Sequence, residues 1–333
     1  MRKIITVIFC SVAACGFAQV GGSHAFDFLN IPTHARVAAL GGVNVSLADK
    51  DINFFYNNPS LAGDTLNGFA SAGYQFYAGD VGQALFSYAH DFKKVGQFIF
   101  GIQHVNYGTL QGFDESGIET MEFNSGETAI MIGKSHQIAN VRFGATVKAV
   151  FSNIAGYRAN AMMMDLGGIF KHPEQDFTIG LAIKNIGIVL SEYTQNSSSD
   201  LPFDVQAGVT LKPEYMPVRF SLTAYNLVKS DLLYYDADMN EAEPATLKKV
   251  FSHLNMAAEI LFHRNFNVMV GYNYLTHQAL KLETGGSGAG VSFGFSVLVK
   301  PVEFVFSRSG YLAGNAGYSF TLSTNINQLL KRR

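Results

Sequence analysis

The sequence predicts an all-β protein, an antiparallel transmembrane β-barrel of about 14 strands with a short N-terminal plug segment. About 14 stretches between Asn67 and Asn327 read as strands, and several of them alternate apolar with polar residues. The connections between them alternate in length, with each long one after an odd-numbered strand. After the N-terminal segment no run of 18 apolar residues occurs, so no membrane-spanning helix is expected. Backbone groups in lipid must be paired internally, and a closed barrel of strands meets that requirement.

The loops define two different ends of the barrel. Long polar connections are expected at Gln111–Ser125, Gly187–Pro202 and Lys229–Val250, and short turns at Lys93–Val95, His172–Gln175, His263–Asn265 and Lys300–Pro301. Outer-membrane barrels have short periplasmic turns and long extracellular loops. A soluble β-sandwich, the alternative, has no reason to sort its loops in this way. A single sandwich also rarely exceeds about 250 residues.

Residues 1–18 read as a secretory signal peptide. Two basic residues precede the apolar stretch Ile4–Ala14, and small residues follow it. Lipidation of Cys15 is the alternative, but a barrel needs no lipid anchor. Both cysteines of the chain, Cys10 and Cys15, lie in this segment. The processed chain is therefore expected to have no disulfide, no thiol catalysis and no cysteine-bound metal.

The composition fits a barrel surrounded by outer-membrane lipid. Charged residues make up 15% of the chain, against about 25% in ordinary soluble proteins. Phenylalanine (28), tyrosine (15) and glycine (33) are abundant. The formal net charge is −2, and no run of basic residues occurs before Lys331–Arg333. No nucleic-acid partner is therefore expected.

Two segments show the alternation of a membrane strand in full. In Val141–Ser152, Val, Phe and Ala alternate with polar or small residues, with one exception at Val150. Val291–Lys300 repeats the pattern with Val and Phe against Ser and Gly. Successive side chains of a strand point to opposite faces. One face is therefore predicted to meet lipid and the other to line the lumen.

The segment before the strands is predicted to plug the barrel. The chain divides into residues 1–18 as signal, 19–64 as plug and 65–333 as barrel. A helical turn is expected with Asn58 as N-cap, Pro59 as first residue and a glycine as its left-handed stop at Gly63. A flexible periplasmic arm is the alternative.

A second short helix is expected over Thr33–Leu40, ended by two glycines. The residues singled out in the plug are Pro32, Arg36, Gly41, Gly42, Asn58 and Pro59.

These plug residues resemble a known family. Phe26–Gly42, followed by Asp49–Gly63 with its Asn-Pro pair, is similar to the opening signature of the PorV/PorQ family. That family is related to FadL-type barrels, which share an Asn-Pro element. The likeness continues in Gly73–Gly79, Leu181–Gly187, Leu201–Gly208 and Met216–Leu227, and lies nearest the PorQ-like members.

The resemblance implies a non-enzymatic, 14-stranded outer-membrane barrel of the type IX secretion system. PorQ-like members hold a surface partner, PorZ, near the PorU sortase, while PorV-like relatives carry cargo and the sortase. The expected location is the outer membrane of a gram-negative bacterium, with the loops facing the cell surface.

No catalytic, cofactor or metal site is expected. The nine histidines lack ligand spacing. Asp49–Asn53 matches the first ligand positions of a calcium loop, but Phe54 replaces its glycine and Ser60 its final glutamate. Gly285–Gly290 leads into a strand and not into a helix, so a phosphate loop is not expected either.

Acidic and aromatic residues of the long loops predict a docking surface, with a plain solvated loop as the alternative. The residues expected to face a partner are Tyr193, Asp231, Tyr234, Tyr235, Asp236 and Asp238. Three functions stay open: a scaffold of the type IX apparatus, a FadL-like channel for hydrophobic solutes with the plug as its gate, and an outer-membrane enzyme. The resemblance places the scaffold first. The lack of an apolar run in the loops argues against transport.

Overall fold

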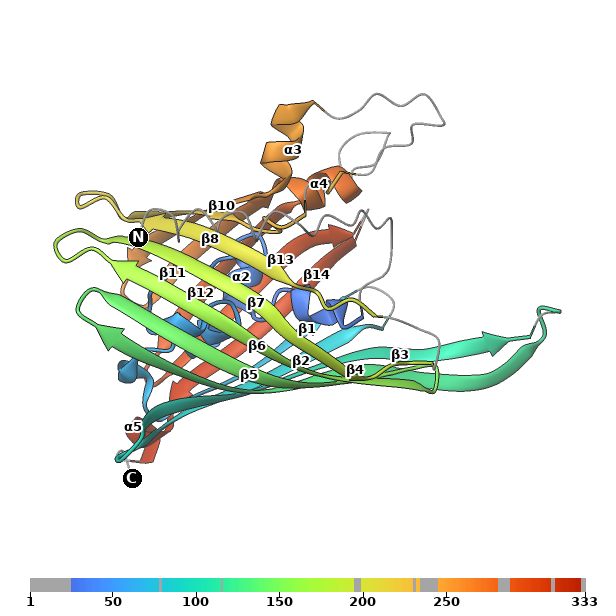
Figure 1. The fold of residues 1–333 in the computed structure, drawn as a ribbon. Coiled ribbons are helices and arrows are strands. Elements are labelled where there is room, and N and C mark those ends of the chain that lie inside the picture. The colour runs from blue at the N-terminus through green and yellow to red at the C-terminus, as the bar shows by residue number, and fades with distance from the viewer. Residues whose placement is uncertain are drawn as a thin grey trace, which may run out of the picture.

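Fourteen antiparallel strands close into one barrel (Figure 1). The computed structural model describes residues 25–77, 80–114, 116–194, 199–229, 232–233, 245–280, 288–312 and 315–330. The strands are β1 (Phe69–Phe76), β2 (Gly82–Phe92), β3 (Gly96–Phe113), β4 (Glu119–Ile138), β5 (Val141–Ile154), β6 (Tyr157–Lys171), β7 (Phe177–Ser191), β8 (Asp204–Leu211), β9 (Val218–Ala224), β10 (Leu254–His263), β11 (Phe266–Asn273), β12 (Val291–Val299), β13 (Val302–Leu312) and β14 (Asn315–Asn325). Each pairs with its neighbours in sequence, and β1 closes on β14. The predicted 14-stranded barrel is confirmed.

The wall is tall on one side and short on the other. β3 and β4 have 18 and 20 residues, whereas β8 and β9 have 8 and 7. A strand needs about 9–11 residues to cross a membrane. The β3–β4 hairpin is longer than this, and it projects well beyond the other strands in Figure 1.

The loop predicted at Gln111–Ser125 is wrong in most of its length. β3 continues to Phe113 and β4 begins at Glu119, with Gln111 paired to Glu122 across the hairpin. Likewise β7 continues to Ser191, so the following loop begins later than predicted. Polar side chains at the end of β3 and the start of β4 hid the extent of that hairpin, because strands that project beyond the others have no lipid-facing side to mark the alternation.

The predicted alternation within the membrane is confirmed. On β5, Phe143, Val147 and Phe151 are exposed on the outer face, whereas Thr146 and Lys148 are buried on the inner face. A lumen filled only with water would leave those inner side chains accessible. Their burial shows that the inside of the barrel is packed.

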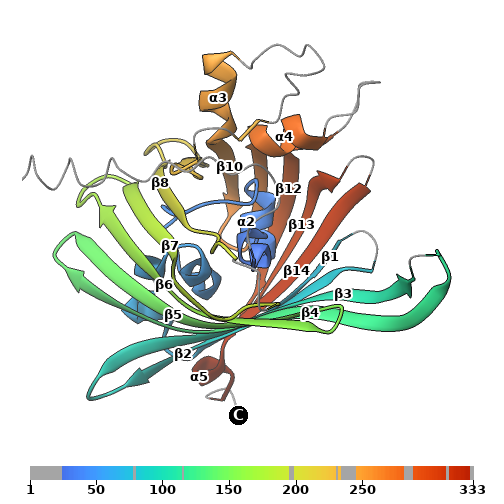
Figure 2. The same cartoon turned by 45° about the vertical axis from the view of Figure 1, so that its right-hand side comes forward.

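The segment before β1 fills the lumen. It forms η1 (Asp27–Asn30), α2 (Ala35–Ala39), η2 (Ile52–Tyr56), η3 (Pro59–Leu61) and η4 (Asp64–Leu66). Figure 2 shows α2 inside the ring of strands. α2 is the helix predicted over Thr33–Leu40, and η3 is the turn predicted after Asn58, whose side chain accepts a hydrogen bond from the Ser60 N–H.

Gly63 does not end a helix in the left-handed conformation as predicted. Its φ is −76°, and η3 already ends at Leu61. A side chain at this position would instead collide with the Arg142 guanidinium. The guanidinium is the far end of a flexible side chain and can move, so this contact alone does not require glycine.

Among the described residues, three short helices lie outside the lumen. α3 (Thr246–Ser252) precedes β10 and α4 (Tyr274–Leu280) follows β11, while α5 (Ile326–Leu330) follows β14 at the opposite end (Figure 1). The rings of Phe251 and Tyr274 join α3 to α4, with 5.9 Å between their centroids. Within the described ranges, no helix is long and apolar enough to cross a membrane.

Candidate functional site: the plug and its barrel contacts

Arg36 of α2 lies at the centre of an ion-pair network between plug and wall. Its Nε donates to Glu259 Oε1 of β10 at 2.9 Å, and its NH2 donates to Asp49 Oδ2 at 2.8 Å. Arg219 of β9 bonds the same two carboxylates at 3.0 and 3.1 Å. Arg36 and Glu259 are 7% and 2% exposed. Buried charges require partners, and this network supplies them from two plug segments and two strands.

The network fixes the charge of its members. Burial alone would lower the pKa of Arg36, but the carboxylates around it raise that pKa above its ordinary value. Partial burial would raise the pKa of Asp49, but Arg36 and Arg219 hold it well below the usual range. Arg36 and Asp49 therefore both stay ionised at neutral pH.

His34 is a buried neutral neighbour of this network. Its ring meets Phe54 edge-on with 4.9 Å between centroids, and its Nδ1 lies 3.1 Å from the Thr33 hydroxyl. Asp51 lies 3.9 Å from its Nε2. Burial lowers the pKa of His34 to about 4, against the attraction of the Asp51 carboxylate. The imidazole is thus uncharged at neutral pH.

Asn58 joins the plug to the opposite wall. Its amide nitrogen lies 2.7 Å from the Val45 carbonyl within the plug, and 3.4 and 3.3 Å from the carbonyls of Gly168 on β6 and Leu181 on β7. Its amide oxygen accepts from the N–H and hydroxyl of Ser60. One side chain therefore caps η3 and holds it against the barrel, with Pro59 fixing the first turn.

The other plug residues singled out in sequence are also held by the wall. Gly41 and Gly42 have φ of 86° and 97°, a left-handed conformation that favours glycine. Asn255 of β10 donates to the Leu40 carbonyl at 2.8 Å, beside this turn. The Pro32 carbonyl accepts from the amide of Gln75 on β1 at 2.6 Å. The structure thus brings Pro32, Arg36, Gly41, Asn58 and Pro59 to the plug–barrel interface, while the Gly42 N–H donates to the Val37 carbonyl within the plug.

Glycines in the wall admit the plug. A side chain on Gly144 of β5 would overlap the backbone of Pro59, and one on Gly167 of β6 would overlap the amide of Asn58. Gly180 and Gly271, on β7 and β11, meet the plug backbone in the same way. The plug and the wall therefore approach at van der Waals distance on several sides.

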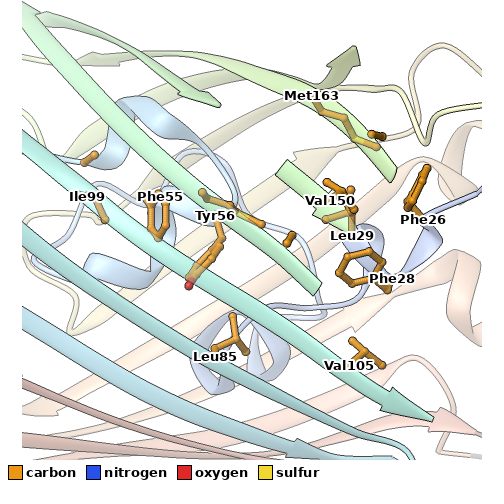
Figure 3. Packing of buried hydrophobic residues seen from close by; sticks show 14 of the residues in the cluster. Phe26, Phe28, Leu29, Phe55, Tyr56, Leu85, Ile99, Val105, Val150 and Met163 are labelled. Carbon is orange, nitrogen blue, oxygen red and sulfur yellow. The ribbon is translucent and has the colours of Figure 1, made fainter. Parts of the chain in front are cut away.

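An apolar cluster fills the lumen on the side of β2 to β6 (Figure 3). From the plug come Phe28, Leu29, Phe55 and Tyr56, which face inner-wall residues of these strands. The Tyr56 hydroxyl donates to the carbonyl of Phe86 on β2 at 2.6 Å. Burial raises the pKa of Tyr56 far above its ordinary value. The cluster leaves this apolar wall covered by the chain's own residues.

A second polar cluster, which the sequence reasoning missed, lies in the wall itself. The Lys148 ammonium contacts Asp165 at 2.6 Å and donates to Asn185 Oδ1 at 2.7 Å. Asn185 has φ of 60°, and the β6–β7 register shifts next to it. The sequence did contain a signal for this cluster, because Lys148 and Asp165 occupy inward-facing positions on two neighbouring strands.

Tyr193 lies at the rim of the lumen. Its hydroxyl donates to Ser152 Oγ of β5 at 2.6 Å, and its ring stacks on Phe26 of the plug at 6.5 Å. Partial burial raises its pKa. Contact of Tyr193 with a partner stays a prediction. The other predicted partner-facing residues, Asp231, Tyr234, Tyr235, Asp236 and Asp238, lie outside the described residues.

At the end with the short turns, a cavity of about 330 Å³ opens beside the plug. Polar and charged residues such as Lys50, Arg142 and Lys171 contribute to its lining. Among the described residues, no group of three or more His, Cys, Asp or Glu side chains could hold a metal ion.

No family model matches this chain. No curated protein matches it in sequence either. A solved structure of a TodX monoaromatic hydrocarbon channel deltaS2 mutant is 13% identical, covers 88% of this chain and 97% of that one, and has a TM-score of 0.53.

A TodX deltaS2S3 mutant is also 13% identical, with 88% and 98% covered and a TM-score of 0.51. A Pseudomonas aeruginosa FadL homologue is 9% identical, with 88% and 98% covered and a TM-score of 0.45. These likenesses concern the fold alone and contain nothing specific to the PorV/PorQ family. In fold, the chain is a closed outer-membrane-type barrel like the TodX channel.

Proposed function

We propose that this protein is a non-enzymatic outer-membrane barrel that is held shut by its plug and anchors a partner at the cell surface. The observation that supports this most is the interlocked plug. Arg36 and Asn58 tie it to strands on different sides of the barrel, and glycines of the wall fit its backbone. The tall β3–β4 hairpin offers surface above the membrane.

The anchored complex, in this proposal, is the attachment complex of the type IX secretion system. A PorZ-like surface protein would bind the outer loops, with the PorU sortase and PorV as indirect partners. The resemblance of the plug sequence to the PorV/PorQ family supports this choice. A barrel that serves only as an anchor needs no open lumen, which agrees with the packed plug.

A channel for hydrophobic solutes is the second candidate, and the structural comparisons favour it over the type IX role. The TodX structures that share the fold are named as monoaromatic hydrocarbon channels. Apolar side chains of β2 to β6, such as Leu85, Val105 and Val150, line part of the inner wall, and such a surface suits a hydrophobic solute. In this reading Phe28 and Leu29 would have to leave that wall before a solute could occupy it.

Deletion of the gene in its native host separates the two candidates. The anchor predicts that proteins with type IX C-terminal signals are no longer attached to the surface, while uptake of a monoaromatic hydrocarbon is unchanged. The channel predicts normal attachment and reduced uptake. Normal attachment would therefore contradict the proposal. Restoration of the wild-type behaviour by a plasmid copy of the intact gene is the control.

A further inference from the structure

Helix α3 leaves the barrel on the outside of the ring of strands. In both views it stands beyond β10, on the side away from the lumen (Figures 1 and 2). Leu247, Val250 and Phe251 on this helix of seven residues are 71%, 53% and 41% exposed. Large apolar side chains clustered at a surface indicate that something other than water covers them.

The lipid-facing band of the wall reaches the base of α3. Met256, near the start of β10, is exposed on the outer face, and its register partner on β11 is Tyr272. Phe251 packs against Tyr274 just beyond them. Tyrosines gather where membrane strands meet the water interface. The apolar side chains of α3 therefore continue the lipid-facing band at its outer edge.

The charge on α3 fits the same surroundings. Lys248 is exposed and lies between Leu247 and Val250 in the chain. A lysine beside apolar side chains at a membrane edge can extend its ammonium to a lipid phosphate while its methylene groups stay among the acyl chains. Anionic lipid attracts such a lysine electrostatically.

We propose that α3 is an interfacial anchor covered by the lipid of the outer leaflet. Leu247, Val250 and Phe251 enter the acyl boundary, and Lys248 binds a lipid phosphate. The anchor lies on the short side of the barrel, where the preceding strand β9 has 7 residues. It would therefore supply membrane contact where the wall itself supplies least. This inference requires the barrel to lie in a membrane, but neither of the two functions proposed above.

A single tryptophan tests the first part, because the chain contains none. Val250→Trp, Met256→Trp and Met121→Trp are each purified as the full chain and placed in phosphatidylcholine vesicles with brominated acyl chains. Met256 faces the lipid band, and Met121 is 75% exposed on the tall β3–β4 hairpin. We expect Val250→Trp and Met256→Trp to lose roughly half of their fluorescence or more, and Met121→Trp to keep its own.

Fluorescence of Val250→Trp that resists quenching, alongside quenched Met256→Trp, would overturn the proposal, because α3 would then lie in water or under protein. If Met256→Trp also resisted quenching, the membrane location itself would be wrong and the proposal with it. Neither result bears on the surface-attachment assay, so failure of this inference and failure of the proposed function can be told apart.

The phosphate contact has its own test. In vesicles that contain phosphatidylglycerol, the emission of Val250→Trp is expected to shift further to the blue than in neutral vesicles. Adding Lys248→Gln should remove that additional shift, while adding Lys94→Gln, in the turn between β2 and β3, should not. Equal shifts with and without Lys248 would overturn the assignment of the lysine.

Discussion

At the scale of single residues, the plug depends on charges that water does not reach. Arg36 meets Glu259 and Asp49 at hydrogen-bond distance while almost fully buried. Such a pair adds little net stability compared with apolar packing, but removing Arg36 leaves Glu259 and Asp49 to share the single charge of Arg219. The plug is therefore sensitive to loss of this one guanidinium.

Arg36→Met should lower the free energy of plug opening by about 3–5 kcal/mol. Hydrogen exchange of the α2 amides in detergent measures that opening. Lys212→Met is the matched control, since Lys212 forms a partly exposed ion pair with Asp176 at 3.5 Å. Such a pair contributes at most about 1 kcal/mol. Equal protection of α2 in both variants would contradict the role of the network.

His34 should make plug opening depend on pH. Its pKa is lowered from 6.5 to about 4 in the closed plug because burial disfavours the cation. When the plug is open, the imidazole is protonated below pH 6.5, whereas in the closed plug it is protonated only below about pH 4. Stability is therefore lost as the pH falls from 6.5 to 4, by up to about 3 kcal/mol.

The same hydrogen-exchange measurement across pH 4 to 7, on the wild-type chain and on His34→Gln, checks this. The variant should show a flatter dependence in that window, because the carboxylates titrate alike in both chains. If the free energy of plug opening depends on pH equally in the two chains, His34 does not cause that dependence.

At the scale of elements, glycines decide where plug and wall touch. Gly144 and Gly167 face the turn at Asn58–Pro59, whereas the neighbouring Gly168 has no atom closer to an added Cβ than 3.9 Å. Adjacent strand residues point to opposite faces, which explains the difference.

Gly167→Ala should therefore weaken docking of the η3 turn by about 1–3 kcal/mol through overpacking. Gly168→Ala should leave docking unchanged. Limited proteolysis of the folded protein between β1 and the plug compares the two. Similar cleavage rates would contradict the assignment of Gly167 as a docking position.

Most elements could be predicted from the sequence. Period-two alternation marks the strands because one face of each meets lipid, and the Asn58–Pro59 pair marks η3 because its capping chemistry is local. The β3–β4 hairpin could not be delimited, since above the membrane neither face is forced to be apolar. The partners of Arg36 were equally hidden, because Glu259 lies 223 positions away and only the closed barrel brings it near.

At the scale of the whole molecule, we expect the plug to determine whether the barrel conducts ions. A ring of 14 strands lies between the 8-stranded barrels filled by their own side chains and the 16–18-stranded porins with an aqueous channel. The lumen is packed because a separate segment occupies it, as Figure 2 shows for α2. Emptying the lumen should open a pore.

The intact chain should show almost no conductance in a planar bilayer, and deletion of residues 25–64 should produce stable open channels. If the deletion does not fold, Gly144→Val with Gly167→Val provides a barrel with a displaced plug. If the variant that folds shows no conductance, the strands themselves close the lumen and the prediction is wrong.

The plug also bonds to the last strands of the barrel, which bears on how the barrel is assembled. The Ala35 N–H donates to Thr321 of β14 at 3.0 Å, and Ser309 of β13 donates to the Ala38 carbonyl at 3.2 Å. β1 and β14 must meet although their paired residues, such as Phe69 and Asn325, lie at opposite ends of the chain. Closing so long a loop costs conformational entropy before any pairing is gained. Because the plug directly precedes β1, its bonds to β13 and β14 can hold β14 near β1 and so favour the strand pairing that closes the barrel.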